Sequence, residues 1–296
     1  MSGPVLITGG AGSVGRILVS RLREEGRPVR IFDLPGMNYA GLEGVEGVEI
    51  VKGSITDRDT VHQAVQGVEA VVHLAALLPP ASERDRAHTF AVNVDGTASI
   101  VQTLEALAPD AVLVFSSSVS TYGDTMHEEP PVRVTHPQRA IDMYAESKIA
   151  AEQVLRSSRA SWIILRIAGI AVPAFQEPPA VWPFMADQRV ELVHRDDVVT
   201  AIHRATTCPA ARGNILIIAG GPSWQTTGRS YVKRLYDPMG VPWEDATFRD
   251  APGWMDWYDT AASQQLLAYQ NTPYEAFLAQ IRAEVDRLMG DVEEAS

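Results

Sequence analysis

The chain has 296 residues, of which 46% are hydrophobic and 21% are charged. This much apolar surface can offset the entropy of ordering the chain, which excludes disorder as its dominant state. With 37 acidic and 25 basic residues the formal net charge is −12, and so acidic a chain is a poor candidate for binding nucleic acid.

The single cysteine and the short apolar runs bear on the cellular setting. Because Cys208 is the only cysteine, the chain can have neither an internal disulfide nor a cysteine-rich metal site. We expect Cys208 to be a small buried residue in a reducing compartment. The apolar runs over 4–8 and 70–78 are far shorter than the roughly 20 residues that cross a bilayer, and no basic segment precedes the first. We therefore expect a cytoplasmic protein with neither a membrane nor nucleic acid as a partner.

Strand-like and helix-like segments alternate through the first two thirds of the chain. The expected strands are mostly continuous apolar runs, typical of strands buried on both faces of a parallel sheet. They cover residues 5–8, 29–33, 48–51, 70–74, 112–116, 162–165 and 215–218. The expected helices cover residues 13–25, 57–65, 88–107, 144–156 and 196–206. This alternation predicts right-handed βαβ crossovers and therefore an α/β fold, a doubly wound parallel (Rossmann) sheet.

The pattern is lost in two stretches. Residues 173–190 contain four prolines, and residues 220–261 contain four of the six tryptophans, which are Trp224, Trp243, Trp254 and Trp257. A helix is expected at 273–289, followed by an acidic tail over 290–296 that is expected to fray. The aromatic rings either pack the core of a small C-terminal lobe or wall a pocket above the carboxyl edge of the sheet, where ligands bind in such folds.

A glycine-rich turn connects the first expected strand to the first expected helix. Gly9, Gly12 and Gly15 in TGGAGSVG permit a tight turn and a close approach of backbone N–H groups to a pyrophosphate, which the helix N-terminus also favours. Asp33 ends the second strand 18 positions after Gly15, where a carboxylate can bind the adenosine ribose and would repel a 2′-phosphate. Arg16 could favour a 2′-phosphate, but is more typical of a helix surface. The motif thus predicts NAD rather than NADP.

Tyr144 and Lys148 stand four residues apart on one expected helix and so share a face. The pKa of a free phenol is near 10, and a neighbouring ammonium, together with the positive charge of an oxidised nicotinamide, would lower it towards the range of a general base. The chain has only three lysines (Lys52, Lys148 and Lys233), which makes a chance pairing rare.

Three serines and two histidines are further candidates. Ser116, Ser117 and Ser118 end the fifth expected strand, where they either cap a turn or hold a substrate oxygen opposite the tyrosine. We expect His73, within a buried run, to be structural and His194 to lie at a helix N-cap. No cluster has the spacing of metal ligands.

With these elements in this order, the chain resembles an extended short-chain dehydrogenase/reductase of the NAD-dependent epimerase/dehydratase type. The resemblance extends over most of the chain and includes HLAA at 73–76, NVDGT at 93–97, SSSVSTYG at 116–123 and HRDDV at 194–198. It implies that Tyr144 is the general acid/base, that Lys148 lowers its pKa and that Ser118 orients the reacting oxygen. The implied cofactor-binding residues are Gly9, Gly12, Ser13, Val14, Gly15, Asp33, Ser54, Ile55, Leu74, Ala75, Ala76, Asn93, Ser116, Tyr144 and Lys148. The resemblance also implies a homodimer formed through the helices at 88–107 and 144–156.

Three departures from the family pattern affect the expected ligands. Ser54 replaces a common aspartate that bonds the adenine amine, so recognition of the cofactor's adenine is expected to depend more on Ile55 and nearby backbone. For the substrate, Gly169 stands where sugar-nucleotide epimerases usually carry asparagine, and the short segment 169–193 leaves few residues for a nucleotide-binding lobe. A UDP- or dTDP-sugar is therefore less expected than a smaller alcohol, ketone, aldehyde, sugar acid or lactone-forming sugar.

We expect two units. The first is an NAD-binding Rossmann domain formed by residues 1–168 together with residues 191–219. The second is a small substrate-binding lobe formed by residues 169–190 and 220–290, and a tail over 291–296 follows it. The expected function is an NAD-dependent oxidoreductase that moves a hydride between the nicotinamide and a small alcohol or carbonyl substrate. Two alternatives stay open. One is a redox-neutral sugar or nucleotide-sugar epimerase or dehydratase with retained NAD, and the other is a non-catalytic dinucleotide sensor that acts on a partner protein.

Overall fold

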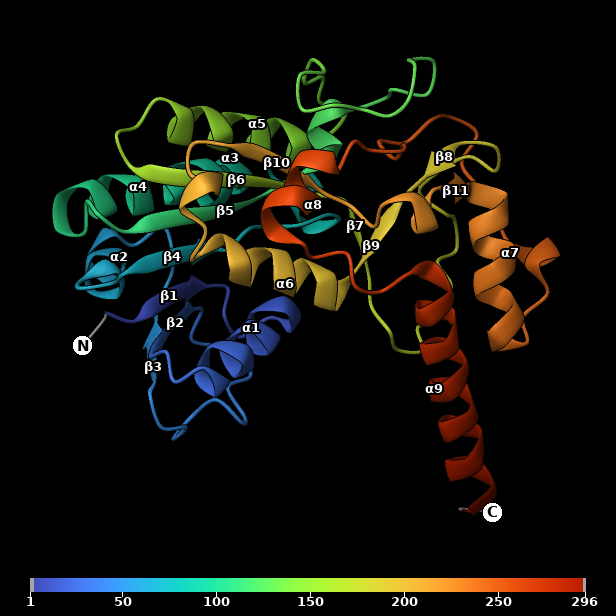
Figure 1. Cartoon of the computed structure of the whole chain (residues 1–296), viewed down its shortest axis with the longest axis horizontal. Helices are drawn as coiled ribbons and strands as arrows, with labels where there is room; N and C mark the ends of the chain where they lie inside the picture. Colours follow the sequence, from blue (N-terminus) through green and yellow to red (C-terminus); the bar gives the residue numbers. More distant parts are fainter. Residues whose placement is uncertain (1–2, 295–296) are drawn as a thin grey trace.

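A seven-stranded parallel sheet forms the centre of the molecule (Figure 1). The computed structural model describes residues 3–294, with side chains described through residue 290. The strand order is β10-β6-β5-β4-β1-β2-β3, and every neighbouring pair is parallel. The strands are β1 (Val5–Thr8), β2 (Val29–Asp33), β3 (Val48–Lys52), β4 (Ala70–His73), β5 (Val112–Ser118), β6 (Ser161–Ile167) and β10 (Ile215–Ile218). All seven predicted strands and the predicted fold class are confirmed.

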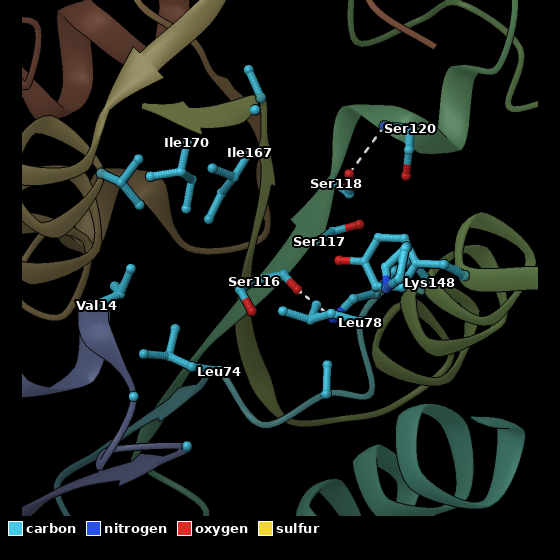
Figure 2. A pocket seen from close by; sticks show the side chains of 18 of the residues that line it. Val14, Leu74, Leu78, Ser116, Ser117, Ser118, Ser120, Lys148, Ile167 and Ile170 are labelled. Atoms are coloured by element: carbon cyan, nitrogen blue, oxygen red, sulfur yellow. Dashed lines mark hydrogen bonds between the residues drawn. The ribbon is translucent and has the colours of Figure 1, made fainter. Parts of the chain in front are cut away.

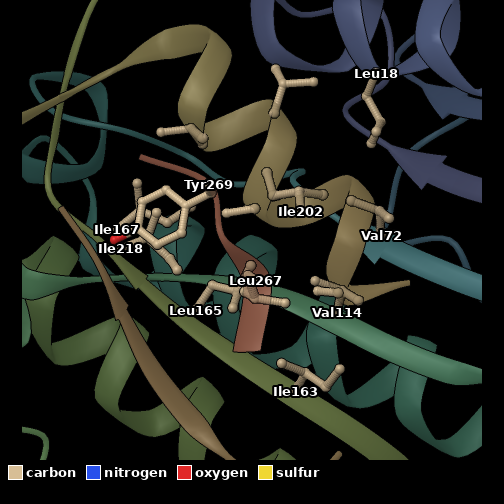
Figure 3. Close-up of a cluster of buried hydrophobic side chains, with 14 of the residues drawn as sticks. Leu18, Val72, Val114, Ile163, Leu165, Ile167, Ile202, Ile218, Leu267 and Tyr269 are labelled. Atoms are coloured by element: carbon tan, nitrogen blue, oxygen red, sulfur yellow. The ribbon is translucent and has the colours of Figure 1, made fainter. Parts of the chain in front are cut away.

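Two apolar cores lie on the two faces of this sheet. Side chains alternate along a strand, so that Val5 and Ile7 of β1 face one core and Leu6 faces the other. The first core, part of which is drawn in Figure 3, is covered by α1 (Ser13–Glu24), α6 (Arg195–Ala205) and α8 (Ala261–Leu267). The second is covered by α2 (Arg58–Val65), α4 (Gly96–Leu107) and α5 (Met143–Arg156). The continuous apolar runs in the sequence follow from this double coverage.

The long helix predicted at 88–107 is divided into three parts. They are α3 (Arg86–Phe90), a π-helical turn η2 (Ala91–Asp95) and α4. Asn93 in the π turn is buried, and Gly96 lies so close to Ile55 that a Cβ at this glycine would be 2.8 Å from Ile55 Cγ2. Hydrophobic periodicity shows the helical face, but it does not reveal the extra residue that widens one turn.

The structure also tests the predictions for His194, Cys208 and the C-terminal helix. His194 is the N-cap of α6, as predicted, and its Nδ1 accepts a hydrogen bond from Asp196 N–H at 3.1 Å. Cys208 is only partly buried, because it lies in the turn that leads into η4 (Pro209–Ala211). The last helix, α9 (Tyr274–Glu294), continues past the predicted end at 289, so the backbone of the predicted acidic tail is helical as far as Glu294. Residues 295–296 lie outside the described residues.

A smaller lobe packs beside the carboxyl edge of the sheet. Its strands form two pairs, β7 (Gly169–Ala171) with β9 (Leu192–His194) and β8 (Arg189–Val190) with β11 (Thr226–Thr227). Helix α7 (Gly228–Met239), which the sequence analysis did not predict, packs against α9. Single-turn helices complete the fold: η1 (Ala81–Glu83), η3 (Val119–Tyr122), η5 (Pro222–Trp224) and η6 (Trp243–Asp245). Within residues 3–294, no helix has the length and apolar character needed to cross a bilayer.

Candidate active site

A cavity of about 590 Å³ opens at the carboxyl ends of β1, β4, β5 and β6 (Figure 2). The strand order reverses between β1 and β4, because β2 lies on one side of β1 and β4 on the other. The crevice at this reversal is the usual ligand site of a doubly wound sheet. Most of the predicted site residues line the cavity, namely Gly9, Gly12, Ser13, Val14, Gly15, Leu74, Ala76, Ser116, Ser118, Tyr144 and Lys148.

The glycine turn gives the cavity a wall of backbone. Gly9 has a φ of +71°, and a Cβ there would lie 2.9 Å from Ala75 N. Gly12 caps α1 without a side-chain hydrogen bond, and no acidic residue stands in the first turn. The free N–H groups and the positive end of the helix therefore face the cavity and suit the pyrophosphate of NAD. At Gly15 a Cβ would lie 2.7 Å from Gly10 Cα, so only glycine permits this close approach of α1 to the turn that precedes it.

Asp33 is held beside this turn at the end of β2. Its carboxylate accepts hydrogen bonds from Ala11 N–H at 3.0 Å and Leu34 N–H at 2.9 Å, although the residue does not itself line the cavity. Arg16 donates to the backbone oxygens of Ala11, Asn38 and Ala40. The guanidinium is thus occupied by backbone acceptors, which favours the interpretation of Arg16 as a structural residue over a 2′-phosphate contact.

Four other predicted cofactor residues do not line the cavity. Ser54 exchanges a hydrogen bond with the Thr56 hydroxyl at 2.7 Å, Ile55 is buried, and Ala75 N–H donates to Thr8 Oγ1 at 3.1 Å. Asn93 binds both backbone groups of Leu77 and donates to Ser147 Oγ at 2.9 Å. Asn93 therefore ties the loop after β4 to α5, which makes it a support of the cavity wall in this structure.

Two carboxylates hold the N-terminus of α5, which carries the Tyr144–Lys148 pair. Asp142 caps the helix by accepting from Ala145 N–H at 2.7 Å, and Glu83 accepts from Met143 N–H and Tyr144 N–H. Lys148 is buried, and its Nζ donates to Ser116 O at 2.8 Å. The same Nζ lies 5.7 Å from the centroid of the Tyr144 ring, so the two side chains share a face as predicted.

Burial alters the pKa values of both groups. Desolvation lowers the pKa of Lys148 to about 8, although the carboxylate of Glu152 works in the opposite direction. Desolvation raises the pKa of Tyr144, and the negative charge of Asp142 raises it further. The expected lowering of the tyrosine pKa by Lys148 is therefore not found in the protein's own groups, because burial and the charge of Asp142 both raise this pKa.

The three serines at the end of β5 have different partners. Ser116 Oγ donates to His73 O at 3.0 Å, and Ser117 Oγ donates to Glu152 Oε1 at 2.5 Å. Ser118 Oγ accepts from Ser120 N–H at 3.1 Å, which caps η3, and the residue also lines the cavity. Its hydroxyl proton is left to donate to another group, so the two interpretations of this serine, a turn cap and a ligand contact, are compatible.

His73 is structural, as predicted. Its Nδ1 lies 2.7 Å from Thr8 Oγ1 and its Nε2 lies 3.0 Å from Thr97 Oγ1. Burial, and then the charge of Lys148, lower its pKa to about 3, so the ring is neutral and its hydrogen bonds link β1, β4 and α4. The described part of the chain contains no group of three or more His, Cys, Asp or Glu side chains that could hold a metal ion.

Sequence reasoning named Ser117 and Trp254 only as alternatives and missed several other residues of the cavity wall. The missed residues are Leu78, Pro79, Ser120, Asp142, Ile167, Ala168, Gly169, Ile170, Val198 and Ile202. Asp142, two residues before the tyrosine, could have been found as the N-cap of its helix. The sequence did not show which of the tryptophans would reach the cavity. The two interpretations of the tryptophans each hold in part, since Trp224 is buried in the core of the lobe while Trp254 lines the cavity.

Comparison with known proteins identifies the family. The model of the NAD dependent epimerase/dehydratase family matches residues 5–173, which is more than half of the chain. The chain belongs to this family. The resemblance to this family that the sequence analysis gave is thereby confirmed. NAD is likewise confirmed as the family's cofactor, and the glycine turn provides a suitable cradle for it.

Several curated members of the family are similar to this chain. A 3 beta-hydroxysteroid dehydrogenase/Delta 5-->4-isomerase of Mycobacterium tuberculosis is 34% identical over 157 residues, which cover 51% of this chain and 41% of that protein. The D-erythronate dehydrogenase of Cupriavidus necator is 32% identical over 185 residues, covering 57% and 55%. The UDP-glucose 4-epimerase of Streptomyces lividans is 29% identical over 199 residues, covering 66% and 56%. The chain thus spans about half the length of the curated relatives it matches.

Solved structures extend the likeness in fold to the whole chain. A short-chain dehydrogenase/reductase superfamily protein from Agrobacterium tumefaciens, crystallised with bound NAD, superposes with a TM-score of 0.81 at 23% identity, covering 98% of this chain and 99% of that one. The lobe beside the sheet therefore belongs to the shared fold.

Proposed function

We propose that this protein is an NAD-dependent oxidoreductase that moves a hydride between the nicotinamide and a small alcohol or carbonyl substrate. The observation that carries the proposal is the convergence of two constellations on one cavity. The glycine turn and the free N-terminus of α1 form one wall, and Ser118, Tyr144 and Lys148 stand on the opposite wall. The first set fits a dinucleotide, and the second set can move a proton at an alcohol oxygen.

The proposed chemistry assigns one task to each of three side chains. In oxidation the phenolate of Tyr144 removes the hydroxyl proton, and Ser118 donates its free proton to the same substrate oxygen. Lys148, fixed by Ser116 O, stabilises the phenolate and binds the nicotinamide ribose. NAD, when bound, supplies the hydride acceptor and a positive charge that favours deprotonation of the phenol. In reduction the protonated Tyr144 donates its proton to the carbonyl oxygen.

The cofactor contacts are proposed along the nucleotide wall. The N–H groups of Ser13, Val14 and Gly15 would bind the pyrophosphate, and Asp33 the adenosine ribose. Further contacts would come from Ser54 and Ile55 around the adenine and from Leu74, Ala75, Ala76, Asn93 and Ser116 along the cofactor. We also propose a cytoplasmic homodimer that pairs through the outer faces of α4 and α5.

A redox-neutral epimerase or dehydratase is the second candidate. The family and the similarity to a UDP-glucose 4-epimerase favour it. Against a nucleotide sugar stands Gly169, which lines the cavity and has no side chain to replace the asparagine that sugar-nucleotide epimerases usually carry at this position. A non-catalytic dinucleotide sensor is the least favoured candidate, because the serine, tyrosine and lysine are all present.

The test is whether reduced nicotinamide accumulates. The purified protein is incubated with NAD and, separately, with D-erythronate, a 3β-hydroxysteroid, UDP-glucose and 1,2-cyclohexanediol, and NADH is followed by its absorbance. A net oxidoreductase produces NADH in proportion to the substrate consumed. Conversion of UDP-glucose to an isomer without NADH would support the epimerase instead. Full activity in Tyr144→Phe would contradict both enzyme proposals.

A further inference from the structure

Large apolar side chains are left exposed at the wall of the cavity. Leu78, in the loop after β4, is 56% exposed, and Ile170, in β7, is 38% exposed. Trp254, from the lobe, also lines the cavity and is only partly buried. Figure 2 shows Ile167 and Ile170 together on one side of the cavity and Leu78 on the side of Lys148. Apolar surface exposed inside a ligand cavity favours an apolar part of the ligand, because the contact removes both from water.

The backbone around Trp254 is held rigidly. The side-chain amide of Gln188, which is fully buried, donates to Gly253 O at 2.9 Å and Met255 O at 2.8 Å and accepts from Gly253 N–H at 3.0 Å. The Tyr258 hydroxyl donates to Trp254 O at 3.0 Å. The Trp254 ring packs against the first core of the sheet and also against the core of the lobe. The indole is therefore a preformed wall at the junction of sheet and lobe.

The cavity wall offers no free cation to an anionic substrate. Among the described residues, Lys148 is the only basic side chain on this wall, and it is buried and donates to Ser116 O at 2.8 Å. The other charged group on the wall is the carboxylate of Asp142. A phosphate or carboxylate on the substrate would therefore lose its hydration without gaining a free cationic partner, and Asp142 would repel it.

We infer that the substrate is an uncharged alcohol or carbonyl compound whose non-reacting part is an apolar ring, which packs against Trp254, Ile170 and Leu78. The inference rests on the proposed function and narrows its substrate, because a nucleotide sugar or a sugar acid carries charges that this wall does not pair. An indole and two branched aliphatic side chains suit a hydrocarbon ring, whereas a hydroxyl-rich sugar would lose hydrogen bonds to water against them.

The first experiment compares three secondary alcohols with the same ring size. They are cyclohexanol, tetrahydropyran-4-ol, in which oxygen replaces one ring methylene, and 4-hydroxycyclohexanecarboxylate, which adds an anion. In each, the carbinol carbon gives its hydride to NAD and the hydroxyl gives its proton to Tyr144, which leaves the ketone and NADH. For the wild type, kcat/KM for cyclohexanol should exceed that for each polar probe by about tenfold or more. Equal values, or a higher value for either polar probe, would overturn the inference.

The second experiment places a cation on the apolar wall. Leu78→Arg should lower kcat/KM for cyclohexanol and raise it for 4-hydroxycyclohexanecarboxylate, each by about tenfold. Val181→Arg is the matched control, because Val181 is 49% exposed and lies outside the cavity wall, and it should change neither value. Both variants should melt close to the wild type, since both side chains are exposed. A Leu78→Arg protein that folds and keeps the wild-type values for both probes would overturn the inference.

Calorimetric titration of the NAD-loaded protein with the same three probes separates this inference from the proposed function. Tighter binding of cyclohexanol than of either polar probe, without any NADH, supports the apolar contact and contradicts the oxidoreductase. NADH formation together with equal or tighter binding of a polar probe supports the oxidoreductase and overturns the apolar contact. Absence of cyclohexanol binding overturns the apolar contact as well.

Discussion

The two halves of the cavity are built in different ways. The nucleotide half, made of residues 9–15 with Leu74 and Ala76, comes from backbone geometry within short stretches of chain. The substrate half, made of Ser120, Asp142, Tyr144, Gly169, Ile170 and Trp254, collects residues from four distant segments. The first half follows from glycine conformations and a helix N-terminus, whereas the second exists only once the sheet and the lobe have folded together.

The largest effect is expected in the substrate half, at Tyr144. Tyr144→Phe removes the acid/base oxygen and keeps the ring, so kcat/KM for the diol probe should fall by about 10²–10⁴-fold while NAD affinity changes little. Steady-state NADH formation and a titration of NAD binding measure the two quantities. The control is Tyr39→Phe, which removes a hydroxyl that donates to Leu34 O outside the cavity. This variant should keep its activity.

In the nucleotide half, Gly9→Ala should weaken NAD binding by about tenfold or more. The variant combines a φ of +71° with a Cβ 2.9 Å from Ala75 N, so the turn must shift away from its present geometry. Gly26→Ala is the matched control, since Gly26 has a φ of +74° but open space around its Cβ. The control should lose about 1–2 kcal/mol of stability and keep its NAD affinity. NAD affinity retained in Gly9→Ala would argue against the cradle.

A smaller effect is expected in the choice of cofactor. Asp33→Asn keeps an oxygen for Ala11 N–H or Leu34 N–H but removes the negative charge that repels a 2′-phosphate. The preference for NAD over NADP should therefore fall by about tenfold, measured as the ratio of the two dissociation constants. An unchanged ratio would place the adenosine ribose away from this carboxylate.

The smallest effect links the helix cap to the chemistry. The carboxylate of Asp142 raises the pKa of Tyr144, so Asp142→Asn should lower that pKa and move the pH–rate profile for oxidation to lower pH. Asparagine still accepts from Ala145 N–H, which keeps the cap. Asp85→Asn, at the similar N-cap of α3, should leave the profile in place. A shift to higher pH in Asp142→Asn would contradict the electrostatic role.

The sequence predicted the fold and the nucleotide half more fully than the substrate half. Seven apolar runs became seven strands, because burial on both faces of a sheet leaves a continuous apolar signal. The π turn at Ala91–Asp95 was missed, because hydrophobic periodicity does not report the extra residue in the turn that carries Asn93. Trp254 reaches the cavity through the packing of the lobe, and the raised pKa of Tyr144 depends on a burial that no sequence motif reports.

The most direct test of the central claim follows the hydride itself. The protein is incubated with NAD and with 1,2-cyclohexanediol carrying deuterium on its carbinol carbons, and the nicotinamide product and the recovered diol are analysed by mass spectrometry. We predict deuterium in the reduced nicotinamide for the wild type and almost none for Tyr144→Phe. Reduced nicotinamide without deuterium, or label that stays in the diol for wild type and variant alike, would contradict it.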